Sequence, residues 1–224
     1  TLPDFSTDKL GANDDTLDNS LVLWLDAENI DSKGNNNAEI TPGSSVAEWK
    51  DLSGNDIHLN QSTNGKYPTF STNGFNGKAS VEFSNVNGTS FTNLQGDGFT
   101  GLKNKDDFTI IIVSQADDIG SQYALISLLN DANHNILIQG SLESRYGATW
   151  RGDIGNNHGG SYKAGFATTT NANIIYVERK GNGVANDELN LHFNGETNIV
   201  NESTYNTASN ESNISSTTNT INLG

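Results

Sequence analysis

The sequence predicts an all-β fold, an antiparallel β-sandwich or jelly roll, on the strength of three observations. Apolar segments recur at the length of strands, and they are bounded by Gly, Asn, Asp or Ser. No segment holds a helical period beyond one or two turns. Asn, Ser, Thr and Gly are abundant, and they suit short strands joined by turns because they tolerate positive φ or bond to nearby backbone.

Two of the expected strands carry a clear pattern. Phe108–Val113 is apolar apart from Thr109, which predicts a central strand buried on both faces. Glu188–Asn194 alternates, with Leu189, Leu191 and Phe193 on one face, which predicts a half-buried strand. The other expected strands are Leu21–Leu25, Val46–Trp49, Ser80–Phe83, Ala124–Leu129, Ile136–Ile138 and Ile174–Val177.

We expect residues 1–19, which are acidic and lack periodicity, to be a linker or N-terminal arm, and residues 20–224 to form a single domain. A sandwich of this size buries roughly 70% of its unfolded surface, so its core forms without disulfides, and the chain has no Cys. No apolar run approaches the ~18 residues of a membrane helix. The chain has no Met, even at position 1, so we expect a piece cut from a larger polypeptide or a processed chain. We expect the domain to be monomeric within that larger chain.

The net charge of −15, from 27 acidic and 12 basic residues, limits the classes of partner that the chain is expected to bind. A polyanion would be repelled, which argues against nucleic acid and anionic membranes. Bound cations would neutralise the excess, and Ca²⁺ is the natural candidate because it takes six to eight oxygen ligands. A solvated acidic surface without bound metal is the alternative.

Side-chain oxygens that could bind calcium follow two of the expected strands. Asp117 and Asp118 come after the apolar strand and are expected on a rim loop. Asp131 opens an Asp-x-Asn-x-Asn sequence that begins like an EF-hand loop. That sequence has Ile136 at the sixth position and Leu142 at the twelfth, where an EF-hand has Gly and Glu. A plain turn stays open as the alternative for each cluster.

The segment from residue 150 to residue 162 combines aromatic, cationic, carboxylate and amide side chains with glycines. Gly159 and Gly160 can present consecutive backbone N–H groups to a ligand carboxylate, with a calcium ion beside them. A long hairpin loop without a ligand is the alternative. The predicted ligand-binding residues are Trp150, Arg151, His158, Gly159, Gly160, Ser161 and Tyr162, and the predicted metal ligands are Asp153, Asn156 and Asn157.

Arrangements typical of enzymes are missing from the sequence. It has no Glu-x-Asp-x-x-Glu strand, on which a glycosidase acid and nucleophile would face one cleft. It has no Gly-x-Ser-x-Gly elbow and no Cys nucleophile. The sequence therefore predicts that the chain is not an enzyme.

An ordered set of motifs runs along the chain. The set begins with a Leu-Val-Leu-Trp-Leu-Asp-Ala strand, continues with a Trp-x-Asp-x-Ser-Gly-Asn segment and ends in a strand followed by Asn-Gly. The segments are Leu21–Ala27, Val46–Asn55, Tyr67–Phe70, Asn76–Lys78, Val81–Phe83 and Leu189–Gly195. In this order they resemble the concanavalin A-like, or laminin G-like, jelly-roll domains of bacterial surface proteins, and the resemblance spans roughly residues 20–224.

More narrowly, the acidic, Cys-free and Asn-rich chain resembles the peptide-binding module of giant RTX adhesins of Gram-negative bacteria, including ice-binding adhesins. That resemblance implies an extracellular module at the bacterial surface. It implies calcium-dependent capture of the exposed C-termini of host cell-surface proteins. A calcium-dependent carbohydrate-binding (lectin) module is the alternative function, and a structural spacer without a ligand is the third.

Overall fold

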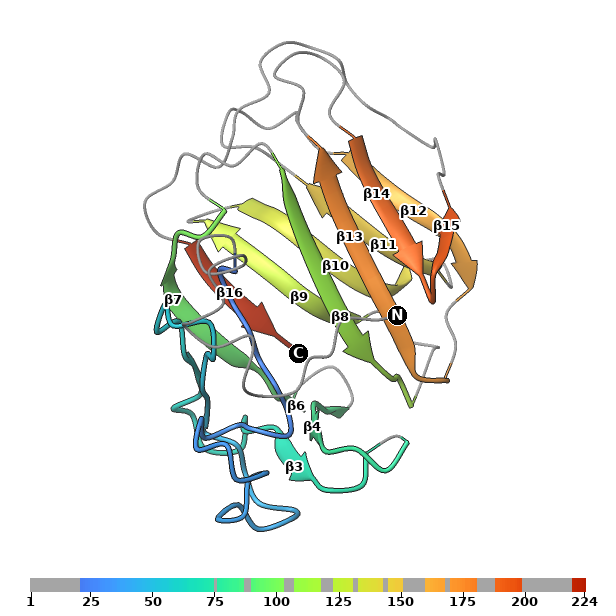
Figure 1. The fold of residues 1–224 in the computed structure, drawn as a ribbon. Coiled ribbons are helices and arrows are strands. Elements are labelled where there is room, and N and C mark those ends of the chain that lie inside the picture. Colours follow the sequence, from blue (N-terminus) through green and yellow to red (C-terminus); the bar gives the residue numbers. More distant parts are fainter. Residues whose placement is uncertain are drawn as a thin grey trace. The chain divides into compact units, whose positions relative to one another are not determined.

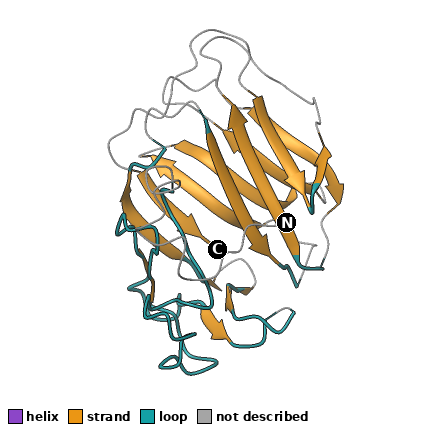
Figure 2. Ribbon diagram, in the orientation of Figure 1, coloured by secondary structure: helices purple, strands orange, loops and turns teal. Residues whose placement is uncertain are grey.

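A computed structural model of the chain describes residues 21–224 apart from several segments. Among the described residues every regular element is a strand and none is a helix, as Figure 2 shows. This part of the chain accordingly contains no helix that could cross a membrane. The predicted all-β class is confirmed. The residues outside the description are 1–20, 75, 87–89, 103–106, 118–122, 131–132, 143–144, 151–159, 168–169, 181–187 and 199–218.

The described residues up to Gly101, together with Gly224, form one compact unit. Its strands are β1 (Glu48–Trp49), β2 (Leu59–Asn60), β3 (Thr69–Ser71), β4 (Ser80–Glu82), β5 (Asn85–Val86), β6 (Ser90–Phe91) and β7 (Leu94–Phe99). They pair antiparallel, β1 with β2, β2 with β7, β3 with β4, and β5 with β6. Most of these strands are two or three residues long, so loops make up much of the unit. Its buried apolar side chains are Ile30, Val46, Leu59, Phe70, Leu94 and Phe99.

The described residues from Leu102 to Leu223 form a second compact unit. Its strands are β8 (Phe108–Ser114), β9 (Tyr123–Asn130), β10 (Asn133–Leu142), β11 (Arg145–Trp150), β12 (Gly160–Ala167), β13 (Asn173–Lys180), β14 (Glu188–Phe193), β15 (Glu196–Asn198) and β16 (Asn219–Leu223). One layer has the order β16-β9-β10-β11-β12, and the other has the order β15-β14-β13-β8. Neighbouring strands run antiparallel, and Figure 1 shows the two layers stacked, with contacts from β14 to β11 and β12. This unit is a β-sandwich.

The sandwich core lies between these two layers. On β13, Ile175 and Val177 are buried while Ile174 is exposed, which is the period of two that a strand imposes on its side chains. On β14, Leu191 and Phe193 are buried, so the predicted alternation is confirmed at these residues. Leu128, Ile138 and Ile221 are buried in the facing layer, and Leu102 and Phe108 are also buried among the described residues of this unit.

The Asn-Gly turn expected after the late strand joins β14 to β15. Asn194 and Gly195 both have positive φ, 51° and 84°, as a two-residue type I′ hairpin requires. The Asn194 side chain also fastens the turn to β13, because its Oδ1 accepts a hydrogen bond from Ile174 N at 2.8 Å. Its Nδ2 donates to Oδ1 of the buried Asn173 at 3.1 Å.

The prediction that Phe108–Val113 is a central strand buried on both faces is wrong. The segment forms β8, but β8 has only one described neighbour, β13, and lies at the edge of the described four-stranded sheet. Ile111 and Val113 are 62% and 58% exposed. Val113 pairs with Ile174, so the apolar surface continues on β13. An unbroken apolar run does not distinguish burial on two faces from an apolar outer face.

The expected strand at Leu21–Leu25 is also absent. Its backbone is held instead by a loop: Trp24 N donates to Asp51 Oδ1 at 3.0 Å, and Leu52 N donates to Trp24 O at 2.8 Å. In Val46–Trp49 only the last two residues form a strand. The single domain over residues 20–224 stays a prediction. The predicted Ser80–Phe83 forms a strand up to Glu82. The segments that form strands over their whole predicted length are Ala124–Leu129, Ile136–Ile138, Ile174–Val177 and Leu189–Phe193.

Neighbouring residues on β13 give a matched test of the sandwich. Ile175→Ala should destabilise the protein by about 2–5 kcal/mol, because Ile175 is fully buried and its loss leaves a cavity. Ile174→Ala, at a site 53% exposed, should change stability by no more than about 0.5 kcal/mol. Urea unfolding measures both, and equal losses would contradict the assigned faces of β13.

Candidate functional site

The predicted ligand loop lies between β11 and β12 of the sandwich. Trp150, the last residue of β11, pairs with Gly160, the first residue of β12, and Thr149 pairs with Ser161. Tyr162 pairs with Ala148, so Trp150, Gly160, Ser161 and Tyr162 all belong to one antiparallel ladder. The predicted site residues Arg151, Asp153, Asn156, Asn157, His158 and Gly159 lie outside the described residues.

The ladder fixes the two ends of this loop. In an antiparallel pair the residues opposite each other are about 4.5–5.5 Å apart between their Cα atoms. Trp150, at the end of β11, and Gly160, at the start of β12, are therefore neighbours in the five-strand layer. Residues 151–159 connect them in the sequence. A ligand that contacts both flanks would meet backbone held by strand pairing.

The predicted metal ligands at the other clusters are only partly described. Asp117 is exposed in a bend that follows β8, consistent with its expected place in a loop after this strand. Asp118 and Asp131 lie outside the described residues. Where the structure describes side chains, no group of three or more His, Asp or Glu could hold a metal ion. Calcium binding at these clusters stays a prediction.

Asp51 organises a buried polar cluster in the first unit. The residue is 5% exposed, and both of its carboxylate oxygens accept hydrogen bonds. Oδ1 accepts from Trp24 N at 3.0 Å and from Ser53 N at 2.9 Å. Oδ2 accepts from Ser53 Oγ at 2.7 Å and from Ile57 N at 3.1 Å. Every one of these bonds leads to the protein itself, so this carboxylate fixes three backbone segments in place.

His58 extends the Asp51 cluster. Its Nδ1 accepts a hydrogen bond from Asp51 N at 3.1 Å, so the ring nitrogen that faces the backbone carries no proton. Asn55 closes the other side, because its Nδ2 donates to the carbonyls of Leu21 and Val22 at 3.0 and 3.3 Å. The Trp-x-Asp-x-Ser-Gly-Asn segment thus holds residues 21–24 without strand pairing.

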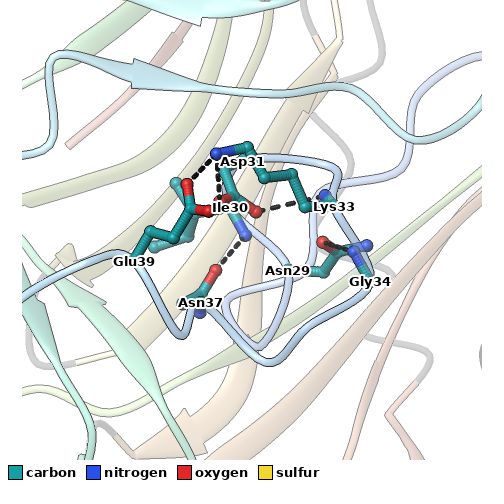
Figure 3. Close-up of polar contacts among 7 residues, drawn as sticks. All are labelled: Asn29, Ile30, Asp31, Lys33, Gly34, Asn37 and Glu39. Atoms are coloured by element: carbon teal, nitrogen blue, oxygen red, sulfur yellow. Dashed lines mark hydrogen bonds and ion pairs between the residues drawn. The ribbon is translucent and has the colours of Figure 1, made fainter.

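The loop from residue 26 to residue 39 forms a second polar cluster (Figure 3). Its buried anchor is Asn37, which is 3% exposed. Asn37 Oδ1 accepts from Ile30 N at 2.6 Å, and Asn37 Nδ2 donates to Ala27 O at 2.7 Å. Asn29 Oδ1 accepts from Gly34 N at 2.9 Å, which closes the turn between them. No pattern in the sequence predicted a role for this loop.

A lysine lies among the oxygens of this loop. The Lys33 ammonium contacts the carboxylate of Glu39 and lies 3.7 Å from Asp31 Oδ2, as the dashed lines in Figure 3 show. The hydrogen bond to Glu39, more than the nearby charge of Asp31, raises the pKa of Lys33 above its ordinary 10.5. Because the pKa of Lys33 is raised, the stabilisation that depends on its charge is still fully present just below pH 10.5 and is lost as the pH rises through the raised pKa.

Comparison with known proteins adds little beyond the fold. No protein-family model matches the chain, and no curated protein matches it. Among solved structures the chain is similar to a conserved carbohydrate esterase from the Shiga toxin-encoding bacteriophage phi24B. The two are 12% identical, with 72% of this chain and 80% of that chain covered and a TM-score of 0.41. The strands of the described residues establish the all-β sandwich independently of this likeness, and no comparison identifies a concanavalin A-like or RTX adhesin family.

The same comparison corrects one expectation. The sequence analysis predicted that the chain is not an enzyme, whereas the solved structure to which it is similar belongs to one. The absence of familiar catalytic patterns from the sequence therefore does not exclude catalysis. A likeness at this identity and TM-score assigns no activity to the present chain.

The role of Asp51 can be tested by a nearly isosteric change. In Asp51→Asn one carboxylate oxygen becomes an NH₂ group, which leaves at least one backbone N–H of Trp24, Ser53 or Ile57 without an acceptor. We expect a loss of about 1–3 kcal/mol for each such amide, measured by urea unfolding. Asp56→Asn, at an exposed site in the same segment, is the control and should be neutral within about 0.5 kcal/mol.

Proposed function

We propose that this chain is a calcium-dependent ligand-binding module of an extracellular bacterial adhesin, built on a concanavalin A-like jelly roll. Its ligand would be the exposed C-terminus of a host cell-surface protein. The observation that best supports this proposal is the pairing of Trp150 with Gly160. It brings the two flanks of the predicted ligand loop together at the end of a β-layer.

The charge balance supports a role for calcium. A peptide C-terminus is anionic, and a chain with a net charge of −15 would repel it at long range. Binding such a ligand therefore needs a local positive field. A calcium ion held by Asp153, Asn156 and Asn157 would supply it, with Arg151 nearby in sequence.

Backbone amides would supply the rest of the carboxylate site. Gly159 and Gly160 lack a Cβ, so a ligand oxygen could approach their N–H groups and that of Ser161 closely. Trp150, His158 and Tyr162 would then contact the side chains of the ligand. The clusters at Asp117, Asp118 and Asp131 would hold further calcium and stabilise loops rather than touch the ligand.

The ligand loop is tested by removing one carboxylate. Asp153→Asn should weaken binding of a peptide with a free C-terminus at least tenfold, which is about 1.4 kcal/mol, as measured by calorimetry in calcium. Asp56→Asn removes the same charge elsewhere and should leave affinity unchanged. The same peptide with an amidated C-terminus should bind neither protein. Unchanged affinity of Asp153→Asn would contradict the proposed site.

The class of ligand is tested by parallel screens. We expect hits in a library of free C-terminal peptides and loss of those hits in EDTA. Hits on a glycan array alone would establish the lectin alternative instead. The absence of hits in both screens would favour a spacer without a ligand. Release of products from a glycan would establish an enzyme.

Calcium should also stabilise the fold. An ion that binds only the native state adds about 2.7 kcal/mol at a hundredfold excess over its Kd. For a chain of this length that corresponds to a rise in Tm of about 5–10 °C. Thermal unfolding in calcium, in EDTA and in magnesium measures it, because magnesium needs a smaller octahedral site and should stabilise less. A Tm that EDTA leaves unmoved would argue against a structural calcium.

A further inference from the structure

Asparagine followed directly by glycine recurs in the turns of this chain. In such a pair the backbone nitrogen of the glycine can attack the side-chain amide carbon of the asparagine, because glycine has no Cβ to obstruct the approach. Asparagine is accordingly counted among the thermolabile residues. The pairs that lie among the described residues are Asn64-Gly65, Asn73-Gly74, Asn76-Gly77 and Asn194-Gly195. They share one reactive sequence, and the structure holds them in different ways.

The pair Asn194-Gly195 is held by the asparagine side chain. Asn194 Oδ1 accepts a hydrogen bond from Ile174 N at 2.8 Å, and Asn194 Nδ2 donates to Asn173 Oδ1 at 3.1 Å. The backbone is held as well, since Asn194 N donates to Ile174 O at 2.9 Å. The Asn194 side chain has to break both of its bonds before it can turn its amide carbon toward the nitrogen of Gly195.

The pair Asn73-Gly74 is held at the attacking nitrogen instead. Gly74 N donates a hydrogen bond to Lys78 O at 2.9 Å. That bond stabilises the protonated form of the nitrogen, whereas the attack requires the nitrogen to lose its proton. The reaction is therefore hindered here although the Asn73 side chain is exposed.

The pairs Asn64-Gly65 and Asn76-Gly77 have neither restraint. Both asparagines are exposed, and in the described part of the chain their side chains make no hydrogen bond. The nitrogens of Gly65 and Gly77 donate to no acceptor among the same residues, and the space beside both glycines is open. Solvent thus reaches both reacting groups.

Two of the pairs form a matched comparison. Asn76 and Gly77 have φ angles of 53° and 68°, and Asn194 and Gly195 have 51° and 84°. Both asparagines are exposed and precede a glycine with positive φ. The two turns differ in the hydrogen bonds of the asparagine side chain, which are present at Asn194 and absent among the described residues at Asn76.

We propose that Asn64 and Asn76 are sites of spontaneous deamidation in the folded protein, and that Asn73 and Asn194 are protected by the bonds that hold them. The glycine nitrogen loses its proton and forms a bond to the asparagine Cγ, and the side-chain nitrogen leaves as ammonia. Water then adds to one of the two carbonyls of the resulting succinimide ring and opens it to aspartate or isoaspartate. No oxidant or reductant takes part.

The modification changes both the charge and the backbone of the first unit. Each event converts a neutral amide into a carboxylate, so reaction at both sites takes the net charge from −15 to −17. Isoaspartate routes the main chain through the side-chain carbon and lengthens it. At Asn64 this alters the turn that Lys66 N closes on Thr63 O at 3.1 Å.

The test is incubation of the full chain at mildly alkaline pH and physiological temperature. Mass spectrometry of fragmented proteolytic peptides measures the loss of amide at each asparagine. In the folded protein Asn64 and Asn76 should each react at least about tenfold faster than Asn194, a factor that corresponds to about 1.4 kcal/mol in the barrier. Asn73 should also react more slowly than both. In urea, where the protecting bonds are lost, all four rates should become similar.

Asn64→Gln and Asn76→Gln are the control variants. Glutamine has one more methylene and must close a larger ring, so each variant should lose the product at its own position and keep the other rates unchanged. Equal rates at Asn76 and Asn194 in the folded protein would show that the dipeptide alone sets the reactivity and would overturn the proposal. A difference between them that persists in urea would overturn it too, because sequence context would then be the cause. So would an Asn64 or Asn76 that reacts in urea but stays intact in the folded chain.

Discussion

The constraint that governs this chain is that each buried backbone N–H and C=O needs a partner, including those in its many loops. In the first unit, where strands are short, side chains provide these partners. Asp51 accepts three backbone N–H groups, and Asn37 bonds one backbone donor and one backbone acceptor. Asn173 and Asn194 tie a hairpin turn to β13 in the second unit. At these positions an asparagine takes the place of a missing strand neighbour, because its short amide side chain can bond nearby backbone.

The proposed ligand loop connects the ends of two strands of the sandwich. Side chains of Ile175, Val177, Leu191 and Phe193 fill one inner face, so the positions of β13 and β14 are fixed by packing. β11 and β12 are fixed by their own ladder up to Trp150 and Gly160.

The strands and turns that depend on residues close together in the chain were correctly predicted from the sequence. The features that depend on tertiary contacts, such as the exposure of a strand or the partner of a charge, were missed. Alternation identified the inner face of β14, and Asn194-Gly195 identified its turn, because both signals lie within a few residues. The apolar run correctly predicted that β8 is a strand, but it did not predict that one face of β8 is exposed. The sequence of a strand does not show where that strand lies in the sheet. The role of Lys33 was missed because a lysine in a polar loop resembles an ordinary surface residue. Only its contacts with Asp31 and Glu39 show it as a counter-ion.

The apolar outer surface of β8 also bears on how the protein behaves in solution. Ile111, Val113 and Ile174 are exposed beside a described sheet edge, an arrangement through which copies of a chain can join edge to edge. Fifteen excess negative charges oppose such self-association, because each copy repels the next. Since salt shortens the range of that repulsion, the colloidal stability of this protein depends on ionic strength.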